Sequence, residues 1–403
     1  MTSRRQFLRF GGSATLAIAG STLLAGCDGL GRGQPVPNGQ IRQATILGVP
    51  NERFFPLLGA DGLDKEFADA SVRQARRRGV ASPGDLDFQL LAVSGGGEDG
   101  AFGAGLLCGW TEHGDRPTFD LVTGVSTGAL TAPLAFLGSA YDPQLRYVYT
   151  DITAASVLRK RYITAALFDD AMADNAPLYR TIASILDERM LAAIARGYDD
   201  GRLLLIGTTD LDAQQPVIWN IGAIAKSGHP RALDTVRRIL LASAAIPGAF
   251  PPTMFDATLD GKHYQEMHVD GGAFVQSFLY PARISIERRR RLSAGQPVPR
   301  ATAYLIRNGR LDANWSEVRR QTLGIAGRAI STMIFANGYN DTLRIYTTAL
   351  RDGIDYNLAF IGPDFTMTLP KPFDRAYMRA LFDYGFDRAK AGYRWDKQPA
   401  LAG

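Results

Sequence analysis

The sequence predicts an α/β fold in which helices flank a central, mostly parallel sheet. Two segments carry this prediction, because each reads as a buried strand, a tight turn and a helix, in that order. The first is DFQLLAV at residues 87–93, which runs into SGGGEDGAFGAGLLCGW. The second is FDLVTGV at residues 119–125, which runs into ALTAPLAFLG. Strands that are joined through helices pair in parallel, so this repeated unit favours a parallel sheet with crossover helices.

The other elements are predicted from their apolar spacing. A polar helix is expected at residues 63–79, and a helix at 231–246 that ends before Pro247. Further strands are expected at 202–211, 216–220, 301–308 and 354–362, and later helices within 313–351 and 374–394. Nothing after residue 41 resembles an interdomain linker, which predicts one domain over residues 41–403.

The composition is that of an ordinary globular chain, with 403 residues of which 46% are hydrophobic and 21% charged. The formal charge of +5 includes Arg4, Arg5 and Arg9, which we expect to be removed; 45 minus 3 leaves 42 basic residues against 40 acidic ones. The charge therefore predicts no nucleic-acid partner. The two cysteines are Cys27 and Cys108. Cys108 lies in an apolar run and is expected to be a buried small side chain.

Residues 1–26 are expected to be an export signal. A pair of arginines in SRRQFLRF precedes an apolar stretch that is too short and too rich in small residues to span a bilayer permanently. The paired arginines resemble the twin-arginine signal, which directs folded proteins across the bacterial inner membrane. An uncleaved anchor is the alternative, and it would also hold the domain at the membrane.

The end of this segment, Leu24-Ala25-Gly26-Cys27, resembles a lipobox. We therefore expect cleavage before Cys27, lipidation of its thiol and a membrane-anchored lipoprotein that faces the periplasm. Asp28 resembles a signal that retains lipoproteins in the inner membrane. Residues 27–40 are rich in Gly and Pro and are expected to form a flexible tether. With Cys27 lipidated, Cys108 has no partner for an internal disulfide.

The glycine-rich turn admits two functional interpretations. Gly95, Gly97 and Gly100 fit the G-x-G-x-x-G pattern of a dinucleotide-binding loop. That interpretation requires an acidic residue at the end of the next strand, where this chain has GVSTG instead. The favoured interpretation is a nest, in which consecutive glycines direct backbone N–H groups at one point and stabilise an oxyanion. A plain structural turn remains the alternative.

The second turn, GVSTG, places Ser126 between Gly124 and Gly128, the pattern of a nucleophile elbow. A serine nucleophile needs a base, and the four histidines are His113, His229, His263 and His268. In α/β-hydrolases the histidine comes last, yet the 135 residues after His268 (403 minus 268) contain none. His268 stays a candidate. Asp270, which Gly271 and Gly272 follow, is the stronger one, because those glycines allow another element to approach its carboxylate.

Three motifs, SGGGEDG, GVSTG and DGG, occur in the order typical of patatin-like phospholipases, and the chain resembles this family over about residues 87–280. GTTDL and the run SAAIPGAFPP at 243–252 add to the resemblance. The resemblance implies a three-layer α/β/α fold and a Ser-Asp dyad of Ser126 and Asp270. It also assigns the oxyanion hole to Gly95, Gly96 and Gly97, and the elbow and motif positions to Gly100, Gly124, Gly128, Gly271 and Gly272. Where many members have an arginine or lysine, this chain has Glu98 and Asp99.

The resemblance implies hydrolysis of fatty acyl esters of phospholipids or lysophospholipids at a membrane. Two alternatives stay open: an esterase on a non-lipid ester, and a lipid-binding lipoprotein without turnover. No metal-ligand spacing or calcium loop stands out, so neither a metal nor a cofactor is expected. An aspartate of ordinary pKa, about 3.9, is a weaker base than histidine, so we expect burial to raise the pKa of Asp270.

Overall fold

The computed structural model describes residues 31–160, 171, 173–313, 315–318 and 320–399. The expected export signal at 1–26, the lipidation site Cys27 and Asp28 lie outside these residues. Within the described part, no helix is both long enough and apolar enough to cross a bilayer.

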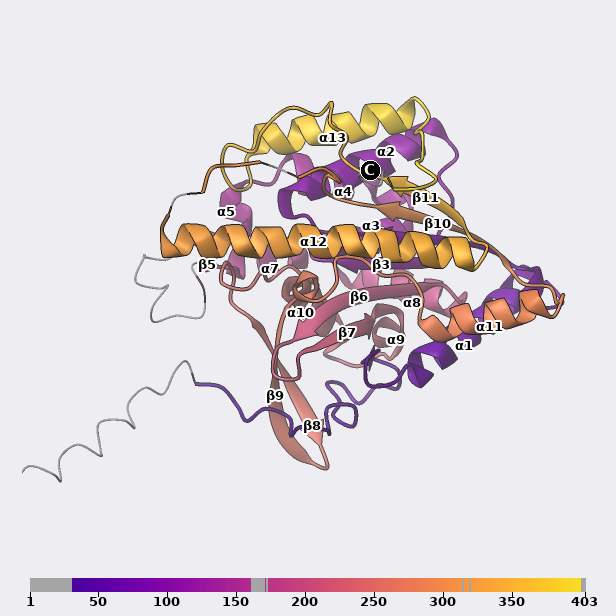
Figure 1. The fold of residues 1–403 in the computed structure, drawn as a ribbon. Coiled ribbons are helices and arrows are strands. Elements are labelled where there is room, and N and C mark those ends of the chain that lie inside the picture. The colour runs from indigo at the N-terminus through magenta and orange to yellow at the C-terminus, as the bar shows by residue number, and fades with distance from the viewer. Residues whose placement is uncertain (1–30, 161–170, 172, 314, 319, 400–403) are drawn as a thin grey trace, which may run out of the picture. The chain divides into compact units, whose positions relative to one another are not determined.

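A nine-stranded mixed sheet forms the centre of the domain (Figure 1). Its main path runs in the order β1 (Arg53–Phe54), β7 (Gln215–Asn220), β6 (Leu203–Asp210), β3 (Leu121–Val125), β2 (Asp87–Val93), β10 (Arg300–Ile306) and β11 (Asp355–Ala359). Five neighbouring strands of this path run parallel to one another: β6, β3, β2, β10 and β11. β1 and β7 pair antiparallel. The parallel centre confirms the predicted fold class.

Helices cover both faces of this sheet, because its strands are apolar on both sides. Along β2, Leu90 and Ala92 belong to one hydrophobic cluster, and Leu91 and Val93 to the other. The first face packs against α1 (Asp61–Arg78) and α12 (Thr322–Arg351). The second packs against α2 (Gly100–His113), α3 (Thr127–Leu137), α7 (Ala176–Ile185), α8 (Glu188–Asp199), α9 (Ile221–Lys226), α10 (Ala232–Ser243) and α13 (Arg375–Lys390). This arrangement is the expected three-layer α/β/α architecture.

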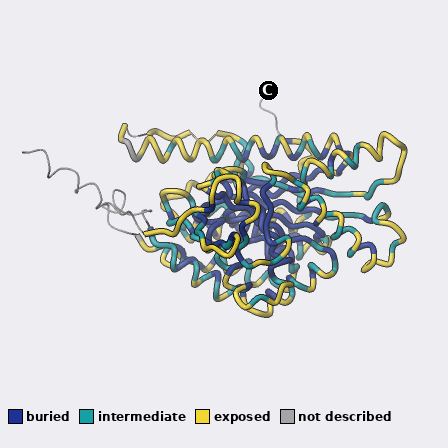
Figure 2. The backbone as a smooth tube through the Cα atoms, turned by 90° about the horizontal axis from the view of Figure 1, so that it is seen from below, coloured by how far each residue is buried: buried dark blue, intermediate teal, exposed yellow. Residues whose placement is uncertain are grey.

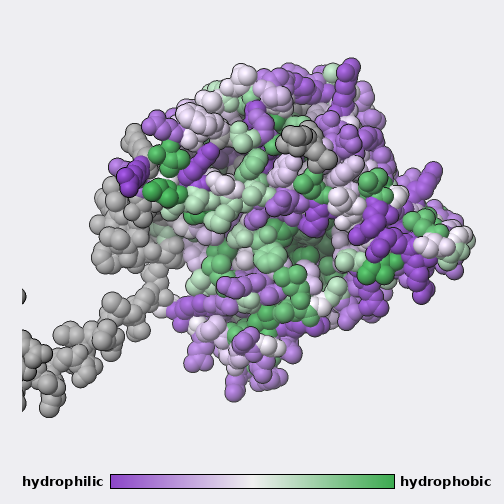
Figure 3. All heavy atoms as spheres, viewed as in Figure 1, coloured by the Kyte–Doolittle hydropathy of each residue, from purple (hydrophilic) through white to green (hydrophobic). Residues whose placement is uncertain are grey.

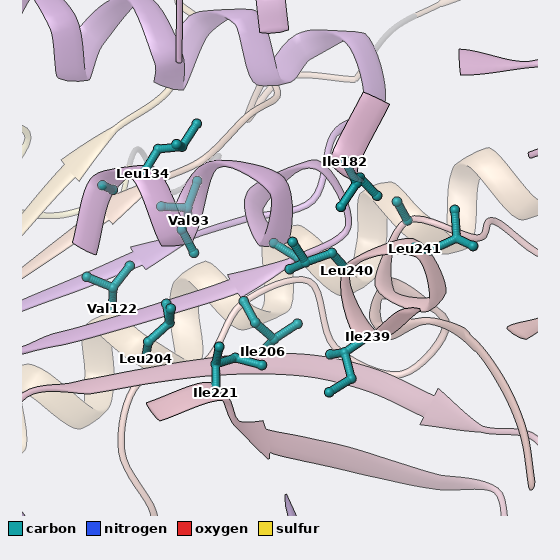
Figure 4. Close-up of a cluster of buried hydrophobic side chains, with 14 of the residues drawn as sticks. Val93, Val122, Leu134, Ile182, Leu204, Ile206, Ile221, Ile239, Leu240 and Leu241 are labelled. Carbon is teal, nitrogen blue, oxygen red and sulfur yellow. The ribbon is translucent and has the colours of Figure 1, made fainter. Parts of the chain in front are cut away.

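Figure 4 shows the core of the second face, where strand side chains meet those of helices. Val122 and Ile206 point from β3 and β6 toward Leu134 of α3 and Leu240 of α10. These residues are at most 3% exposed, so the carboxyl ends of the central strands rest on a close-packed layer.

The strands expected at 87–93, 202–211, 216–220, 301–308 and 354–362 are all present, within a few residues of the predicted ends. The structure adds a hairpin that the sequence did not predict, β8 (Thr253–Leu259) and β9 (Lys262–Asp270), which joins β6 at Thr208–Asp210. It also adds α4 (Asp142–Thr150), α5 (Ala154–Val157), β4 (Arg159–Lys160), β5 (Ala173–Asp174) and α11 (Ala282–Ser293). The hairpin was missed because the buried face of β9 is polar, which hides the usual alternation of a strand.

The segment expected to be a tether contacts the domain before residue 41. The Gly33 N–H donates to the side chain of Gln265 (2.9 Å), and the Gln34 carbonyl accepts from the Gln265 N–H (2.8 Å). Val36 is buried. The compact unit accordingly begins at Gly33.

The small residues of α2 allow close packing against α13. A Cβ atom on Gly105 would lie 2.0 Å from the Phe382 carbonyl oxygen, and one on Gly109 would lie 2.1 Å from that of Phe386. Cys108, in the same helix, is buried, and burial raises the pKa of its thiol to about 12. This thiol is a packing residue and not a nucleophile.

Candidate active site

Ser126 stands at the sharp turn between β3 and α3, as the elbow pattern predicts. Its backbone has a φ of 56°, which is rare for a residue other than glycine. The flanking glycines are required by close approach: a Cβ on Gly124 would lie 2.4 Å from the Gly128 carbonyl oxygen, and one on Gly128 would lie 2.2 Å from that of Val93. The serine is therefore held at the carboxyl edge of the sheet, beside the positive N-terminus of α3.

A second serine fixes the main chain of the elbow. The Ser126 N–H donates to the hydroxyl oxygen of Ser243 (3.0 Å), and that hydroxyl donates to the Gly207 carbonyl (2.7 Å). Ser243 ends α10 and is fully buried. Ser243 is the first residue of the run SAAIPGAFPP, and its sequence context predicted no role for it.

Asp270 ends β9 and is 4% exposed. Its main-chain N–H donates to Ala245, and its Oδ1 accepts the Gly272 N–H (2.7 Å). The Ser126 hydroxyl lies close enough to lower the pKa of this carboxyl, but Oδ2 makes no hydrogen bond of regular geometry with a described residue. Burial is the largest influence and raises the pKa to about 7. The carboxylate is thus poised to exchange a proton near neutral pH.

The two glycines after Asp270 also have a steric reason. A Cβ on Gly271 would lie 2.5 Å from the Gly207 carbonyl oxygen, and one on Gly272 would lie 2.3 Å from Nε2 of Gln276. The close approach of β6 therefore carries the carboxylate to the elbow, which is the reason proposed from the sequence.

Of the three glycine N–H groups expected to form the oxyanion hole, two lack a hydrogen-bond partner among the described residues. The Gly95 N–H donates to the Gln276 carbonyl (3.2 Å), so this amide is not available to an oxyanion and the expectation for Gly95 is corrected. Gly95 serves packing, because a Cβ there would lie 3.1 Å from Cβ of Ser126. The N–H groups of Gly96 and Gly97 donate to no described residue. Gly100 is also a packing position, since its Cβ would lie 2.3 Å from Oγ1 of Thr127.

Residues far along the chain clamp this loop. The Asn308 side chain donates to the Ser94 carbonyl (2.9 Å) and accepts the Gly103 N–H (3.1 Å). Asp341 of α12 accepts the N–H of Gln276 (2.7 Å). These contacts were not predicted, because Asn308 and Asp341 belong to no motif and lie more than 200 residues after the loop.

The acidic pair that follows the loop is engaged by the C-terminal part of the chain. Glu98 accepts the N–H of Phe373 (2.9 Å), and Asp99 accepts the hydroxyl of Tyr377 (2.6 Å). Burial raises the pKa of Asp99 to about 6. Both carboxylates thus tie the loop to α13 and the segment before it.

A pocket of about 920 Å³ extends from Ser126 and Gly97 into an apolar layer. Its walls come mainly from α3, α7 and α10, and include Leu130, Leu134, Leu178, Ile182, Ile185, Met190, Leu240 and Phe250. A larger pocket, of about 1490 Å³, includes Phe88, Leu121 and Leu203 near the amino ends of the parallel strands, and neither Ser126 nor Asp270 lines it. Ser126 therefore opens onto the apolar pocket, whereas Asp270 lines neither pocket.

No hydrogen bond joins any of the four histidines, all of them described, to Ser126. His268 is fully buried, with Nδ1 2.9 Å from the Thr208 hydroxyl and Nε2 3.1 Å from Glu266. Asp210, Glu266 and His268 offer ligand atoms within 4.8 Å of one another, as a metal site would. Arg53, however, pairs with Glu266 and already supplies the positive charge of this buried cluster. His268 is thus part of the support of β9, and the titratable group that lies beside Ser126 is the Asp270 carboxyl.

One family model matches the part of the chain that contains this site. Residues 91–282 match the family model described as patatin-like phospholipase. Among solved structures, the crystal structure of VipD from Legionella pneumophila has 12% sequence identity and a TM-score of 0.30, and the match covers 77% of this chain and 67% of that one. A search of curated proteins returned no significant match. The matched range contains the glycine-rich loop, Ser126 and Asp270.

Proposed function

Since residues 91–282 form a patatin-like phospholipase domain, of a family of lipid acyl hydrolases, we propose that this chain cleaves fatty acyl esters through a dyad of Ser126 and Asp270. The observation that carries the proposal is the position of Ser126, between a buried carboxyl of raised pKa and the mouth of an apolar pocket. Gly96 and Gly97 add two N–H groups that donate to no residue in the described part of the chain.

In the proposed mechanism, the Asp270 carboxylate takes the proton of Ser126 as Oγ attacks the ester carbonyl. The N–H groups of Gly96 and Gly97 stabilise the tetrahedral oxyanion, and the alcohol leaves with the proton that Asp270 held. Asp270 then deprotonates a water molecule, which attacks the acyl-serine ester and releases the fatty acid. The dyad returns to its starting state after each cycle.

The pocket supports fatty acyl chains as the substrate group. Its walls are almost entirely apolar, so a chain of methylenes gains roughly 0.8 kcal/mol per CH₂ that leaves water. A small polar ester would leave this surface unused, which disfavours the non-lipid alternative. We therefore favour phospholipids or lysophospholipids as substrates.

We further propose that the chain is a lipoprotein of the bacterial cell envelope, anchored through Cys27 and facing the periplasm from the inner membrane. The support comes from the sequence alone, in the paired Arg4 and Arg5 and the run Leu24-Ala25-Gly26-Cys27. Metabolic labelling with a clickable fatty acid tests it. We expect labelling of the wild type and none of Cys27→Ser, and equal labelling of both would contradict the proposal.

The catalytic proposal is tested by incubating the wild type, Ser126→Ala and Asp270→Asn with defined phospholipids and measuring the released fatty acid by mass spectrometry. Both variants should lose at least about a thousandfold in rate, because each removes a partner of the proton transfer. A fluorophosphonate probe should label the wild type and not Ser126→Ala. Release that persists in either folded variant would rule out the dyad, and a wild type that the probe does not label would favour a lipid-binding protein without turnover.

A further inference from the structure

The exposed face of α12 changes its chemistry halfway along the helix. In the C-terminal half, a buried stripe of Gly338, Thr342, Ile345 and Ala349 faces the domain. The opposite stripe is exposed and polar, as in an ordinary surface helix, and consists of Asn340, Arg344, Thr347 and Arg351. The domain therefore packs against one side of this half and leaves the other to water.

In the N-terminal half, the exposed stripe is apolar. Its residues follow one another at helical spacing and are all exposed: Ile325, Ala329, Met333 and Ala336. The Ile325 side chain is 52% exposed and that of Met333 is 58% exposed. Figure 2 draws this half of α12 mostly in yellow, and Figure 3 shows hydrophobic side chains gathered over the start of the helix. The usual amphipathic pattern is absent from this half, because nearly every residue from 324 to 333 is exposed and the apolar stripe is exposed with the rest.

The N-terminal half has one charged side chain, that of Arg328, and no acidic one. No Asp or Glu occurs between Thr322 and Asn340. The hydroxyls of Ser331 and Thr332 donate to main-chain carbonyls four residues earlier, at 3.0 and 2.8 Å. Hydroxyls that are satisfied in this way lose little in an apolar environment.

This half of the helix lies beside the catalytic edge of the sheet. α12 connects β10 to its parallel neighbour β11, so the helix begins at the carboxyl edge and returns toward the amino edge. The helix contacts the segments that hold the glycine-rich loop at two positions. Gly338 packs against the Arg307 side chain, and Asp341 accepts the N–H of Gln276. The 16 residues from 322 to 337 precede these contacts and span about 24 Å.

Other exposed apolar side chains occur in segments that leave the same edge. Trp315, which is 86% exposed, lies between β10 and α12. Met367 and Leu369 follow β11, and Phe274 follows Asp270, and each is more than 40% exposed. Exposed apolar residues that gather at one edge indicate a surface that something apolar covers.

We propose that the N-terminal half of α12, together with Trp315, docks on the surface of a lipid bilayer and brings the pocket mouth to its substrate, an inference that rests on the proposed function. The helix lies on the membrane and does not cross it, since no described helix is apolar enough to span. A bilayer fits better than a protein partner, because the stripe offers apolar area without acidic groups and tryptophan favours the membrane interface.

The test uses the full chain with Ser126→Ala, so that lipid is not consumed, and vesicles of phosphatidylcholine with brominated acyl chains. Bromine quenches tryptophan only at short range, and Trp315→Phe identifies the share of the signal that Trp315 contributes. Quenching is compared between this protein, Ile325→Glu/Met333→Glu and the control Thr347→Glu/Leu350→Glu. The control adds the same two charges to the polar half of the same helix, where Leu350 is 65% exposed.

We expect the lipid concentration for half-maximal Trp315 quenching to rise more than about tenfold in Ile325→Glu/Met333→Glu and to stay unchanged in the control. Every variant keeps the same N-terminal residues, so the difference reports on α12. Equal quenching in all three proteins would overturn the proposal. So would self-association in the absence of lipid that Ile325→Glu/Met333→Glu abolishes, because the stripe would then bind a second copy.

Activity measurements distinguish a failure of the docking proposal from a failure of the catalytic proposal. With Ser126 restored, Ile325→Glu/Met333→Glu should hydrolyse a soluble short-chain ester at the wild-type rate and vesicle lipid more than about tenfold more slowly. Loss of both activities would contradict a docking role. A wild type that is quenched by brominated lipid but hydrolyses neither substrate would retain the docking surface and reject the enzyme.

Discussion

The Ser243 hydroxyl accepts a hydrogen bond of 3.0 Å from the main-chain N–H of Ser126. Because that hydroxyl also donates to Gly207, it ties the elbow to β6 at the place where the backbone of Ser126 has a positive φ. A strained elbow persists only when its surroundings hold it. Ser243 is therefore a positioning residue for Ser126, the proposed nucleophile.

Replacing Ser243 by Ala should lower stability by about 1–3 kcal/mol, because it leaves the Ser126 N–H buried and unpaired. It should also reduce kcat on a soluble ester by roughly tenfold with little change in KM, since the nucleophile is misplaced while the pocket is intact. Urea titration and steady-state kinetics measure the two effects. Ser184→Ala, which removes an exposed hydroxyl on α7, is the control. A variant that loses stability but keeps kcat would assign Ser243 to the fold alone.

The acid limb of the activity profile should report on Asp270. Burial raises the pKa of this carboxyl to about 7, and only the ionised form accepts the Ser126 proton. We expect kcat/KM on a soluble ester to rise with pH and reach half its maximum near pH 7. A midpoint near pH 4 would show that the carboxyl titrates as an ordinary aspartate and would contradict its burial.

The same carboxyl should make stability depend on pH. The folded state keeps the Asp270 proton up to about pH 7, whereas the unfolded chain releases it near the ordinary value of 3.8. The folded state therefore binds more protons between about pH 4 and 7, and this contribution to stability falls as pH rises through that window. Asp270→Asn removes the cost of the buried charge and should exceed the wild type by up to about 4 kcal/mol at pH 8. At pH 4 the two should unfold at similar urea concentrations, and a constant difference at both pH values would disprove the linkage.

Gly96 and Gly97 both offer an N–H group to an oxyanion, but only Gly96 is also required by close packing. A Cβ on Gly96 would lie 2.0 Å from the Asn308 carbonyl oxygen, whereas one on Gly97 would meet no atom within 4 Å. Gly96→Ala should displace the loop and cost at least about a hundredfold in kcat. Gly97→Ala keeps its N–H, and it should lower the free energy of unfolding by only about 1–2 kcal/mol, because alanine is strained at a φ of 57°. Kinetics of both variants on one ester decide between these roles, and equal losses would contradict the assignment.

The sequence was sufficient to predict the parallel centre of the sheet, because β2, β3 and β6 are continuous apolar runs that end in turns. It was not sufficient to predict β9, whose inward residues Glu266 and His268 are polar. Those side chains are buried only because Arg53 and Thr208 satisfy them, and both partners are distant in sequence. A buried polar face looks like a surface segment until its partners are known.

The prediction of the site was also limited, because some of its residues act through partners that are distant in sequence. Ser126 and Asp270 were found because each lies in a local motif with glycines that close packing requires. Ser243, Gln276 and Asp341 act through hydrogen bonds with main-chain groups of distant residues, and such bonds impose no local sequence pattern. The role of Gly95 was assigned wrongly for a related reason: its N–H is taken by the Gln276 carbonyl, which a glycine triplet does not reveal.

The apolar pocket should set the acyl chain length. Ile182 lines the pocket and is 5% exposed, so Ile182→Phe adds volume where an acyl chain would lie. Long-chain esters should lose more than about tenfold in kcat/KM, while a butyryl ester should stay within about threefold, because only the longer chain needs the filled space. Ile239→Phe crowds a buried site outside the pocket and controls for the general cost of overpacking, about 1–3 kcal/mol. Rates on a series of p-nitrophenyl esters measure the effect, and a parallel loss for all chain lengths would place the acyl chain elsewhere.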